Sequence, residues 1–466
     1  MNIVFKTIKT PTGFFVYDRN RDALLNVSSS EYDELEAVSC GKVRDTESKV
    51  LSKYQKDGYL LENKLEGIEH PYTHTLEHLL SHHMEQLILQ VTQSCNLRCG
   101  YCVYSGNYTN REHSNLEMDA FTAYAAIDMY VRCAEEVDIL KVAFYGGEPL
   151  LKFELIQKCV EYIKVKARGK KIDFFITTNG TLLTKRVAKY LELNKFNITV
   201  SLDGPEKEHD RYRKFTNGEG SFNSLRNNLS RIKEDYPILF QKIGFNLVIN
   251  PEHDYKKLKD FFEDDDLISS QPLNLSLVEP KDSTKTIEEG YSNEFRLIRK
   301  FDYLKLLFNM LGELDEQYIS KFILGNKQTV YKRYDQIKKQ TFTGRLGHHS
   351  GPCVPGSRRV FVSTLGYMYP CERVPETSED MRIGHVTTGF DIEKIKQLLN
   401  IGKLSEDDCL QCWAFYHCNI CPKKALDKNC LSCQVKSINC TESKKNAFIN
   451  LKELCALKEL GCTFNA

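Results

Sequence analysis

The sequence predicts an α/β protein whose central part is a partial barrel of parallel strands. From residue 87 onward, short runs of apolar or β-branched residues alternate with longer amphipathic segments, as expected of a parallel sheet covered by helices. The 17 cysteines are the second observation, because none falls within 160–352 and most gather within 95–102 and 353–462. The first cysteine group follows the first predicted strand, which is where barrel enzymes place their chemistry.

Six strands with helices between them predict a partial (βα)6 TIM barrel over residues 87–280. The candidate strands are Leu87–Thr92, Lys141–Tyr145, Asp173–Thr178, Asn197–Leu202, Lys242–Ile249 and Asn274–Leu277. The clearest helical patterns between them are Met118–Ala134, Leu151–Ala167 and Phe222–Glu234.

Residues 1–66 predict a small separate module that is winged-helix-like. Strands at Lys6–Lys9 and Gly13–Tyr17 flank a turn, and two short helices follow. The serine run 28–30 can cap a first helix beginning at Glu31, and the second would run over Glu47–Lys56.

Residues 67–86 predict a linker helix with a row of histidines. Four-residue spacing would put them on one helix face. A zinc site is one interpretation of this row, and a solvated linker helix is the favoured one. The histidines are His70, His74, His78 and His82.

Two further units follow the barrel. Residues 281–345 predict a helical bridge, in which one helix face carries Leu297, Phe301, Leu304, Phe308 and Leu311. Residues 346–466 carry eleven cysteines with few long apolar segments, which predicts a region folded around metal. A last helix is expected near Ser443–Leu457.

Composition excludes several classes of protein. The 64 Lys and Arg nearly cancel the 63 Asp and Glu, so no nucleic-acid partner is expected. No apolar run is long enough to span a membrane and no secretory signal begins the chain, so we expect a cytoplasmic protein without a membrane partner. In a reducing cytosol, clustered cysteines indicate metal ligands or catalytic thiols rather than disulfides.

Cys95, Cys99 and Cys102 form a CxxxCxxC loop after the first strand. Three thiolates can bind three irons of a [4Fe–4S] cube and leave the fourth iron open to a small ligand. A zinc loop is the alternative, but zinc sites commonly use four protein ligands and the next cysteine, Cys133, lies in a helical pattern.

With Tyr101 directly before its last cysteine, this loop resembles the signature of radical S-adenosylmethionine (SAM) enzymes. Further motifs follow in that family's order over about residues 87–280. The resemblance implies that a Gly-Gly-Glu-Pro motif meets the amino group of SAM, that a serine contacts it, that an arginine clamps its carboxylate and that a valine lies near its adenine. The matching cofactor-binding positions are Gly146, Gly147, Glu148, Pro149, Thr178, Asn179, Ser201, Asp203, Arg213 and Val248.

The resemblance also implies the chemistry. A reduced cluster would cleave bound SAM to a 5′-deoxyadenosyl radical, which takes a hydrogen atom from an unactivated carbon of the substrate. An electron donor such as flavodoxin or ferredoxin would be needed.

The second cysteine field resembles the SPASM domain, which carries two auxiliary [4Fe–4S] clusters. One departure from the family pattern is that two residues, not three, separate Cys418 from Cys421. The resemblance implies three clusters in all, with Cys353, Cys371 and Cys421 on the first auxiliary cluster and Cys409, Cys412, Cys418 and Cys440 on the second. A pair of zinc ribbons is the alternative. Cys430 and Cys433 compete with Cys440 as the closing ligand, and Cys455 and Cys462 stay unassigned.

The first auxiliary cluster would have only three ligands, so its fourth iron is open to a substrate thiolate. Glu372, next to Cys371, is a candidate substrate base because some relatives have an acid there. An exposed or salt-bridged glutamate is the alternative interpretation.

The N-terminal module resembles the peptide-recognition element of peptide maturases, which captures a leader as an added strand. A DNA-binding winged helix is disfavoured by the near-zero net charge. We therefore expect a maturase of a Cys-containing precursor peptide with a leader, forming thioether crosslinks of the sactipeptide or ranthipeptide type. Carbon–carbon crosslinking or oxidation to formylglycine is the alternative, and a zinc adaptor without activity is a third class.

Overall fold

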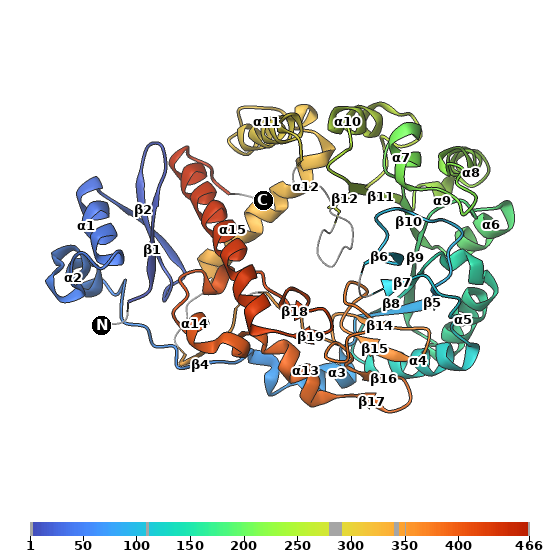
Figure 1. Cartoon of the computed structure of the whole chain (residues 1–466), viewed down its shortest axis with the longest axis horizontal. Helices are drawn as coiled ribbons and strands as arrows, with labels where there is room; N and C mark the ends of the chain where they lie inside the picture. The colour runs from blue at the N-terminus through green and yellow to red at the C-terminus, as the bar shows by residue number, and fades with distance from the viewer. Residues whose placement is uncertain (1–2, 109–110, 279–290, 340–343, 350, 465–466) are drawn as a thin grey trace.

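The computed structural model describes residues 3–108, 111–278, 291–339, 344–349 and 351–464. A barrel of strands and helices occupies one end of the molecule, a small sheet with two helices occupies the other, and a long C-terminal helix lies between them (Figure 1). Within the described residues, no helix combines the length and apolarity that crossing a bilayer needs.

The six barrel strands are confirmed, each within two residues of its expected bounds. They are β5 (Gln86–Thr92), β8 (Ile139–Gly146), β9 (Lys171–Thr178), β10 (Asn197–Ser201), β11 (Ile243–Ile249) and β12 (Leu273–Leu277). Each pairs in parallel with the next in that order. All their carboxyl ends therefore meet at one end of the barrel, where the cysteine loop begins.

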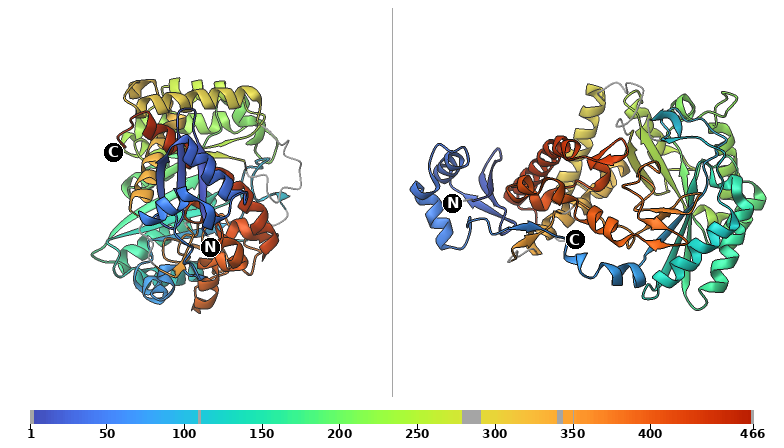
Figure 2. Two further views of the ribbon diagram at one scale, coloured as in Figure 1. Left: turned by 90° about the vertical axis from the view of Figure 1, so that its left-hand side faces the viewer. Right: turned by 60° about the horizontal axis from the view of Figure 1, so that its bottom comes forward.

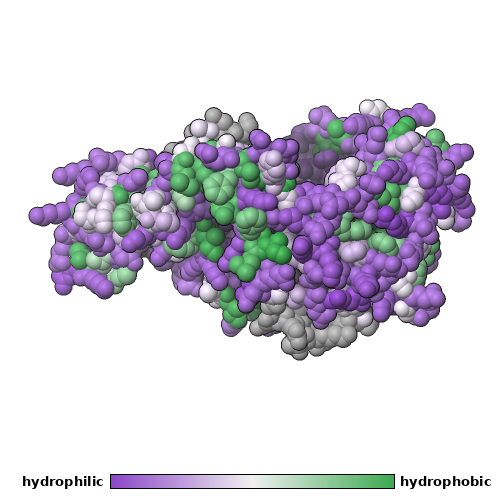
Figure 3. Space-filling view, turned by 90° about the horizontal axis from the view of Figure 1, so that it is seen from above, coloured by the Kyte–Doolittle hydropathy of each residue, from purple (hydrophilic) through white to green (hydrophobic). Residues whose placement is uncertain are grey.

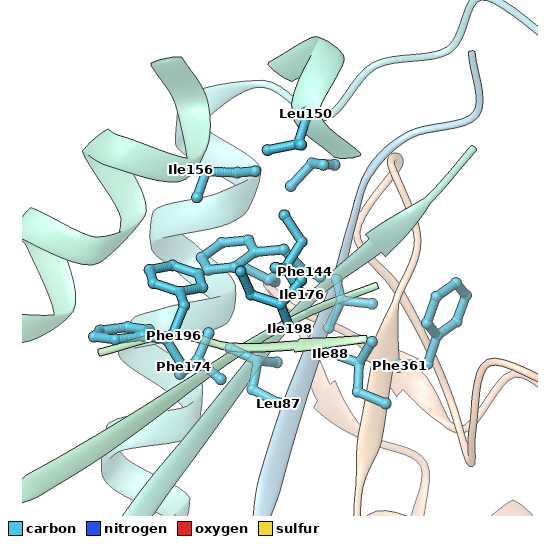
Figure 4. Packing of buried hydrophobic residues seen from close by; sticks show 14 of the residues in the cluster. Leu87, Ile88, Phe144, Leu150, Ile156, Phe174, Ile176, Phe196, Ile198 and Phe361 are labelled. Carbon is cyan, nitrogen blue, oxygen red and sulfur yellow. The ribbon is translucent and has the colours of Figure 1, made fainter. Parts of the chain in front are cut away.

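Helices cover the outer face of this sheet. The main ones are α4 (Ala120–Cys133), α5 (Phe153–Lys166), α6 (Lys185–Leu193), α8 (Phe222–Asp235) and α10 (Tyr255–Asp264), with shorter α7 (Glu206–Tyr212) and α9 (Pro237–Phe240) between them. Phe144, Phe174 and Phe196 stack at the centre of the layer between strands and helices (Figure 4). This continuous hydrocarbon core fixes the strand ends that carry the candidate site.

The sheet continues into the C-terminal third of the chain. Strand β14 (Val360–Val362) pairs in parallel with β5, and β15 (Tyr367–Tyr369), β16 (Gly384–His385) and β17 (Gly389–Phe390) follow as antiparallel neighbours. The ten-stranded sheet thus crosses the boundary that the sequence suggested at residue 346. The cysteine-rich region is consequently anchored on the barrel through β14.

The N-terminal module has the expected strands and helices with one strand more. Strands β1 (Phe5–Lys9), β2 (Phe14–Asp18) and β3 (Ala23–Val27) form an antiparallel sheet. Helix α1 (Ser29–Ser39) starts at a Ser28–Glu31 capping box, and α2 (Lys49–Lys56) follows.

This module is not the separate unit that the sequence suggested. One face of its sheet packs on α1 and α2, while Ile8, Phe15 and Tyr17 on the other face pack against Leu451 and Cys455 of α15 (Cys433–Glu459). Figures 1 and 2 both show this sheet beside α15. Alternating apolar residues on both faces of a short sheet require two partners, and the second comes from the far end of the chain.

The predicted linker helix is only partly helical. Strand β4 (Gly67–Ile68), a 3-10 turn at Pro71–Thr73 and helix α3 (Leu76–His82) make up this segment. His70 is buried, caps the 3-10 turn and packs against His348 at 4.0 Å between ring centroids. The four histidines therefore do not share one helix face, because Pro71 starts a tighter turn before α3 begins.

The helical bridge consists of α11 (Asn293–Met310) and α12 (Lys321–Lys339), and its expected residues 281–290 and 340–343 lie outside the described ones. The apolar face predicted on α11 exists, but Leu297, Phe301, Leu304 and Phe308 are exposed on it. The opposite face, with Phe295 and Leu306, packs inward. Figure 3, seen from above, shows the apolar patches on this side of the molecule.

The cysteine-rich region is built from short elements. They are β13 (Leu346–Gly347), α13 (Ile392–Leu399), α14 (Glu406–Leu410), β18 (Leu426–Asp427) and β19 (Cys430–Leu431). The last helix, α15, begins ten residues before the expected Ser443, because Ser432 caps it by accepting from the Val435 amide.

Candidate functional site

The three cysteines of the first loop lie just after β5. The Leu97 amide donates to the Cys95 sulfur at 3.3 Å and the Tyr104 amide donates to the Cys102 sulfur at 3.5 Å. Burial raises the pKa of Cys95 to about 11 and that of Cys99 to about 12. A bound cation would be needed to turn these thiols into thiolate ligands, as metal sites do.

Among the described residues, one group of three metal-ligating atoms lies within 4.8 Å of one another, and it consists of His78, His83 and Glu136. Of the predicted histidine row, only His78 belongs to this group. The structure does not decide between the zinc site and the solvated helix that the sequence left open for this segment.

Gly146 and Gly147 pack on the cysteine loop itself. The Gly147 amide donates to the Thr92 carbonyl at 2.9 Å, and the Glu148 amide donates to the Ser94 carbonyl at 2.9 Å. A Cβ on Gly147 would lie 2.2 Å from the Ser94 oxygen, and Gly146 has φ of +137°. The glycine pair therefore sets the course of the chain entering Cys95.

Glu148 ties two strand ends together. Its buried carboxylate accepts from the Thr178 hydroxyl at 2.8 Å, from the Asn179 amide at 2.7 Å and from the Leu150 amide at 3.0 Å, just after Pro149 opens a 3-10 turn. Burial raises the pKa of Glu148 to about 7 against these hydrogen bonds. The Asn179 side chain also reaches the Cys95 sulfur at 3.9 Å. Contact of Glu148 with the SAM amino group stays a prediction.

Arg213 and Asp203 form a buried ion pair against the loop. The Arg213 Nε lies 2.8 Å from Asp203, and its Nη1 lies 3.9 Å from the Cys99 sulfur. The Tyr101 hydroxyl donates to Asp203, and the Val248 amide donates to the other carboxylate oxygen at 3.1 Å. Burial would raise the pKa of Asp203, but Arg213 and its other partners hold it below the ordinary value.

These contacts give Arg213 partners within the protein, whereas the resemblance implied a clamp on the SAM carboxylate. Ser201 ends β10 and is half-buried, as is Val248 in β11. The structure thus brings the predicted cofactor-binding residues to one end of the barrel around the three cysteines.

Glu376 is a site residue that the sequence did not reveal. Its carboxylate accepts from Gln90 at 2.8 Å, from Gln93 at 2.9 Å and from the Tyr104 hydroxyl at 2.8 Å. Glu376 follows Cys371 by five residues, and Tyr104 follows Cys102 by two. A segment of the cysteine-rich region therefore docks on the cysteine loop of the barrel, a contact between residues distant in sequence that no local motif signals.

Glu372, the predicted base, lies instead in an ion pair. Its carboxylate is 3.3 Å from Arg359 and 3.7 Å from Arg373. This is the salt-bridged alternative, and a role as substrate base stays a prediction. Beside it, burial raises the pKa of the Cys371 thiol, and Cys421 adds to that rise, while Gly351 brings the segment before Cys353 against the Ile420 backbone.

The four cysteines predicted for the second auxiliary cluster share one cavity of about 560 Å³ with Lys436. Cys409, Cys412, Cys418 and Cys440 all line it. Cys430 and Cys433 are exposed and do not, so Cys440 is the better placed closing ligand. Cys455 and Cys462 are buried in apolar clusters.

Residues 89–264 match the Radical SAM superfamily model. The barrel is a radical SAM domain. An uncharacterized protein of Methanocaldococcus jannaschii is 38% identical over 30% of this chain and 45% of its own length. A cysteine-type anaerobic sulfatase-maturating enzyme of Clostridium novyi is 34% identical over 34% of this chain and 43% of its own. This chain thus spans less than half the length of both relatives.

A longer match is to the serine-type anaerobic sulfatase-maturating enzyme of Bacteroides thetaiotaomicron, 24% identical over 73% of this chain and 83% of that one. Among solved structures, native anSMEcpe with bound AdoMet superimposes with a TM-score of 0.56 at 23% identity, covering 80% of this chain and 99% of that one. This likeness shows the fold, and the match to the Radical SAM superfamily model is confined to residues 89–264, the barrel.

The residues present fit the groups that a radical SAM domain implies. Three thiols in one loop, two of them receiving backbone N–H donors, suit an iron–sulfur cluster with one open iron. Ser201 and the Val248 backbone face the same barrel end, where SAM would be held.

Proposed function

We propose that this chain is a radical SAM peptide maturase that joins a cysteine sulfur of a ribosomally made precursor peptide to a carbon of another residue. The bonds broken are C–H and S–H, and the bond formed is C–S. The hydrogen atom leaves with the 5′-deoxyadenosyl group of SAM, a proton leaves to a base, and one electron returns to an iron–sulfur centre.

The observation that carries the proposal is the contact between the cysteine loop of the barrel and the segment after Cys371 in the cysteine-rich region. Glu376 holds the segment after Cys371 against Gln90, Gln93 and Tyr104. A substrate thiolate bound at an open iron near Cys371 would therefore lie on the side of the auxiliary region that faces the barrel end. A peptide carbon bound at that end would then be within reach of the same substrate's sulfur.

The N-terminal module supports a peptide substrate. Its strand β3 pairs with β2 and, among the described residues, with no other strand, so its second edge is suited to an added strand of leader peptide. The match to anSMEcpe covers 99% of that chain but only 80% of this one, so this protein carries a fifth of its length beyond the shared fold. A leader-binding module is our interpretation of the N-terminal part of that surplus.

A second candidate is oxidation of a cysteine or serine to formylglycine, favoured by the similarity to sulfatase-maturating enzymes. Carbon–carbon crosslinking is the remaining alternative. All three reactions use the same radical end of the barrel and differ in what happens to the substrate thiol.

Mass spectrometry of a Cys-rich precursor incubated with anaerobically reconstituted enzyme, SAM and a flavodoxin or ferredoxin reductant separates them. A thioether removes two hydrogens and blocks one thiol for each link. Loss of sulfur would indicate formylglycine made from cysteine. Loss of two hydrogens with every thiol still alkylatable would indicate formylglycine made from serine if the product reacts with a hydrazide, and carbon–carbon crosslinking if it does not.

The leader site can be tested with a photo-crosslinking amino acid at Asn26, an exposed residue of β3. We expect crosslinks to the leader segment of the precursor, and none from the same group at exposed Lys56 of α2. Equal yields from both positions would contradict strand addition at β3.

A further inference from the structure

Lys436 is a fully buried cation at the cavity of Cys409, Cys412, Cys418 and Cys440. It is 1% exposed, and its ammonium donates to the Cys409 sulfur at 3.2 Å. Its other acceptors are the Ser405 hydroxyl and the Gly402 carbonyl, both neutral. A buried ammonium without a carboxylate among these partners is costly unless an anionic group lies beside it.

Arg19 is a second buried cation at the same cysteines, and it comes from the N-terminal module. It lies in the turn between β2 and β3 with 0% exposure, and its Nη1 donates to the Leu410 carbonyl at 3.2 Å. Leu410 lies inside the turn from Cys409 to Cys412. The turn is therefore inserted into the cysteine-rich region rather than resting on its surface.

The guanidinium of Arg19 is incompletely satisfied. Its Nε and Nη2 are buried without a hydrogen-bond partner among the described residues. Neither carboxylate of the same turn hydrogen-bonds Arg19: Asp18 accepts from the Leu60 amide, and Asp22 accepts from Tyr17 and His417 at one oxygen, while its other oxygen is buried without a partner among the described residues. Buried, unpaired donors on a cation are rare in native proteins and indicate an anionic partner.

A [4Fe–4S] cluster with four thiolate ligands is such a partner, because the whole centre carries negative charge. Hydrogen bonds to the sulfurs and nearby positive charge stabilise the reduced state, which is the more negative one, and so raise the reduction potential. Both cations are placed for this effect. Lys436 donates to the sulfur of Cys409, and Arg19 donates to the Leu410 carbonyl between Cys409 and Cys412.

We propose that Lys436 and Arg19 set the reduction potential of the cluster held by Cys409, Cys412, Cys418 and Cys440, and that Arg19 makes this potential depend on the docked N-terminal module. The inference rests on the auxiliary cluster of the proposed function but not on the reaction that the enzyme performs. It assigns the β2–β3 turn a role besides any leader binding at the β3 edge.

The docking surface explains how the module and the cluster are connected. Tyr17, two residues before Arg19, packs against Trp413 with ring centroids 6.5 Å apart, and Trp413 follows Cys412 directly. His417, next to Cys418, lies 3.0 Å from Asp22 of the same turn. A displacement of the N-terminal module would therefore disturb Leu410 and Trp413, on either side of Cys412, and His417, next to Cys418.

The test is an EPR-monitored redox titration of the full-length reconstituted protein. Cys95, Cys99 and Cys102 are changed to alanine to remove the barrel cluster, and the signal lost on Cys412→Ala identifies the cluster of interest. The variants are Lys436→Met and Arg19→Met, which remove charge at similar length. The matched control is Lys445→Met, an exposed lysine of the same helix as Lys436 that does not line the cavity.

We expect each of Lys436→Met and Arg19→Met to lower the midpoint potential, with at least a tenfold smaller ratio of reduced to oxidised cluster at a fixed potential, or about 59 mV for a one-electron couple. Lys445→Met should leave the midpoint potential unchanged, and Arg19→Lys should keep it close to the native value. Unchanged potentials in both methionine variants at full iron and sulfide content would overturn the proposal.

Loss of the cluster is also informative. If Arg19→Met fails to hold iron and sulfide while Arg19→Lys holds both, the charge is required for the anionic centre and the proposal stands. If Arg19→Lys is as defective as Arg19→Met, the charge is not the cause and the proposal fails. No peptide is present in these measurements, so failure of the thioether reaction would leave their outcome untouched.

Discussion

The barrel and the cysteine-rich region are stabilised in different ways. Barrel strands of five to eight residues pair in parallel around one continuous apolar core. By contrast, residues 401–432 consist of helices and 3-10 turns of three to five residues and two strands of two residues, arranged around a cavity lined by thiols. The barrel builds its core from hydrocarbon, while the second region has short elements that a bound centre would hold together.

The two regions also differ in the groups that position their cysteines. In the barrel, Glu148 and the Asp203–Arg213 pair position the cysteine loop through buried hydrogen bonds. In the cysteine-rich region, buried cations from α15 and from the N-terminal module surround the thiols. Removal of iron should therefore destabilise the cysteine-rich region more than the barrel.

Removal of iron by a chelator under oxidising conditions should give the largest effect. We expect amide hydrogen exchange in residues 405–432 to accelerate by about tenfold or more, because this region has only small apolar clusters, such as Phe415 and Tyr416 on Ile68, and a bound centre would add most of the resistance to local unfolding. Strands β5, β8, β9, β10 and β11 should keep their protection. Exchange followed by mass spectrometry gives the result, and equal acceleration in both regions would remove the distinction.

The two kinds of cysteine should also fail differently. Cys99→Ala should abolish 5′-deoxyadenosine formation from SAM, because it removes a ligand of the barrel cluster. Cys412→Ala should keep part of this cleavage but yield no modified peptide. Chromatography of 5′-deoxyadenosine beside peptide mass spectrometry measures both, with exposed Cys40→Ala as control. A Cys412→Ala enzyme with normal product would contradict a role for the second cavity.

Gly147→Ala probes the contact that shapes the barrel loop. Its Cβ would lie 2.2 Å from the Ser94 oxygen, so the chain before Cys95 must shift, at a cost of about 1–3 kcal/mol in folding free energy. We expect less iron in the barrel cluster and at least about tenfold less SAM cleavage, since a shift of about 1 Å at a reacting group costs more than that. Gly325→Ala has open space around it and serves as control; equal activity of the two variants would contradict the prediction.

Glu376→Gln tests the dock between the regions. Charge-assisted hydrogen bonds contribute about 1.5–3 kcal/mol each, so losing the carboxylate should lower peptide product by about tenfold. The ratio of product to 5′-deoxyadenosine should fall, because cleavage of SAM continues without a positioned substrate. Glu372→Gln is the matched comparison, and a larger loss there would favour Glu372 as the base.

The smallest effect concerns pH. Burial lowers the pKa of His209 to about 3, and its Nδ1 accepts from the Asp203 amide. The unfolded chain binds a proton near pH 6.5, so the stability from neutral His209 is complete above that value and falls as the pH drops towards 3. Thermal unfolding at pH 7 and pH 5 should show a smaller difference for His209→Gln than for the native protein.

Much of this arrangement could be predicted from the sequence where local pattern decides it. Apolar runs identified the six barrel strands, and the serine run 28–30 located the start of α1 to within two residues. The cysteine spacing placed Cys95, Cys99 and Cys102 in one loop. The prediction that the four histidines share one helix face was wrong. Pro71 starts a 3-10 turn in place of the helix, and the four-residue spacing of the histidines does not reveal this change.

What only the tertiary structure decided are the contacts between distant segments. Glu376 meets Gln90 across 286 residues and Arg19 meets Leu410 across 391, and neither pair has a spacing that a sequence motif could display. Sequence by itself determined the strands, the loop of three thiols and the class of chemistry, because these depend on neighbours along the chain. The placement of charge around the cysteines depends on which surfaces exclude water together, and that is settled only when the whole chain packs.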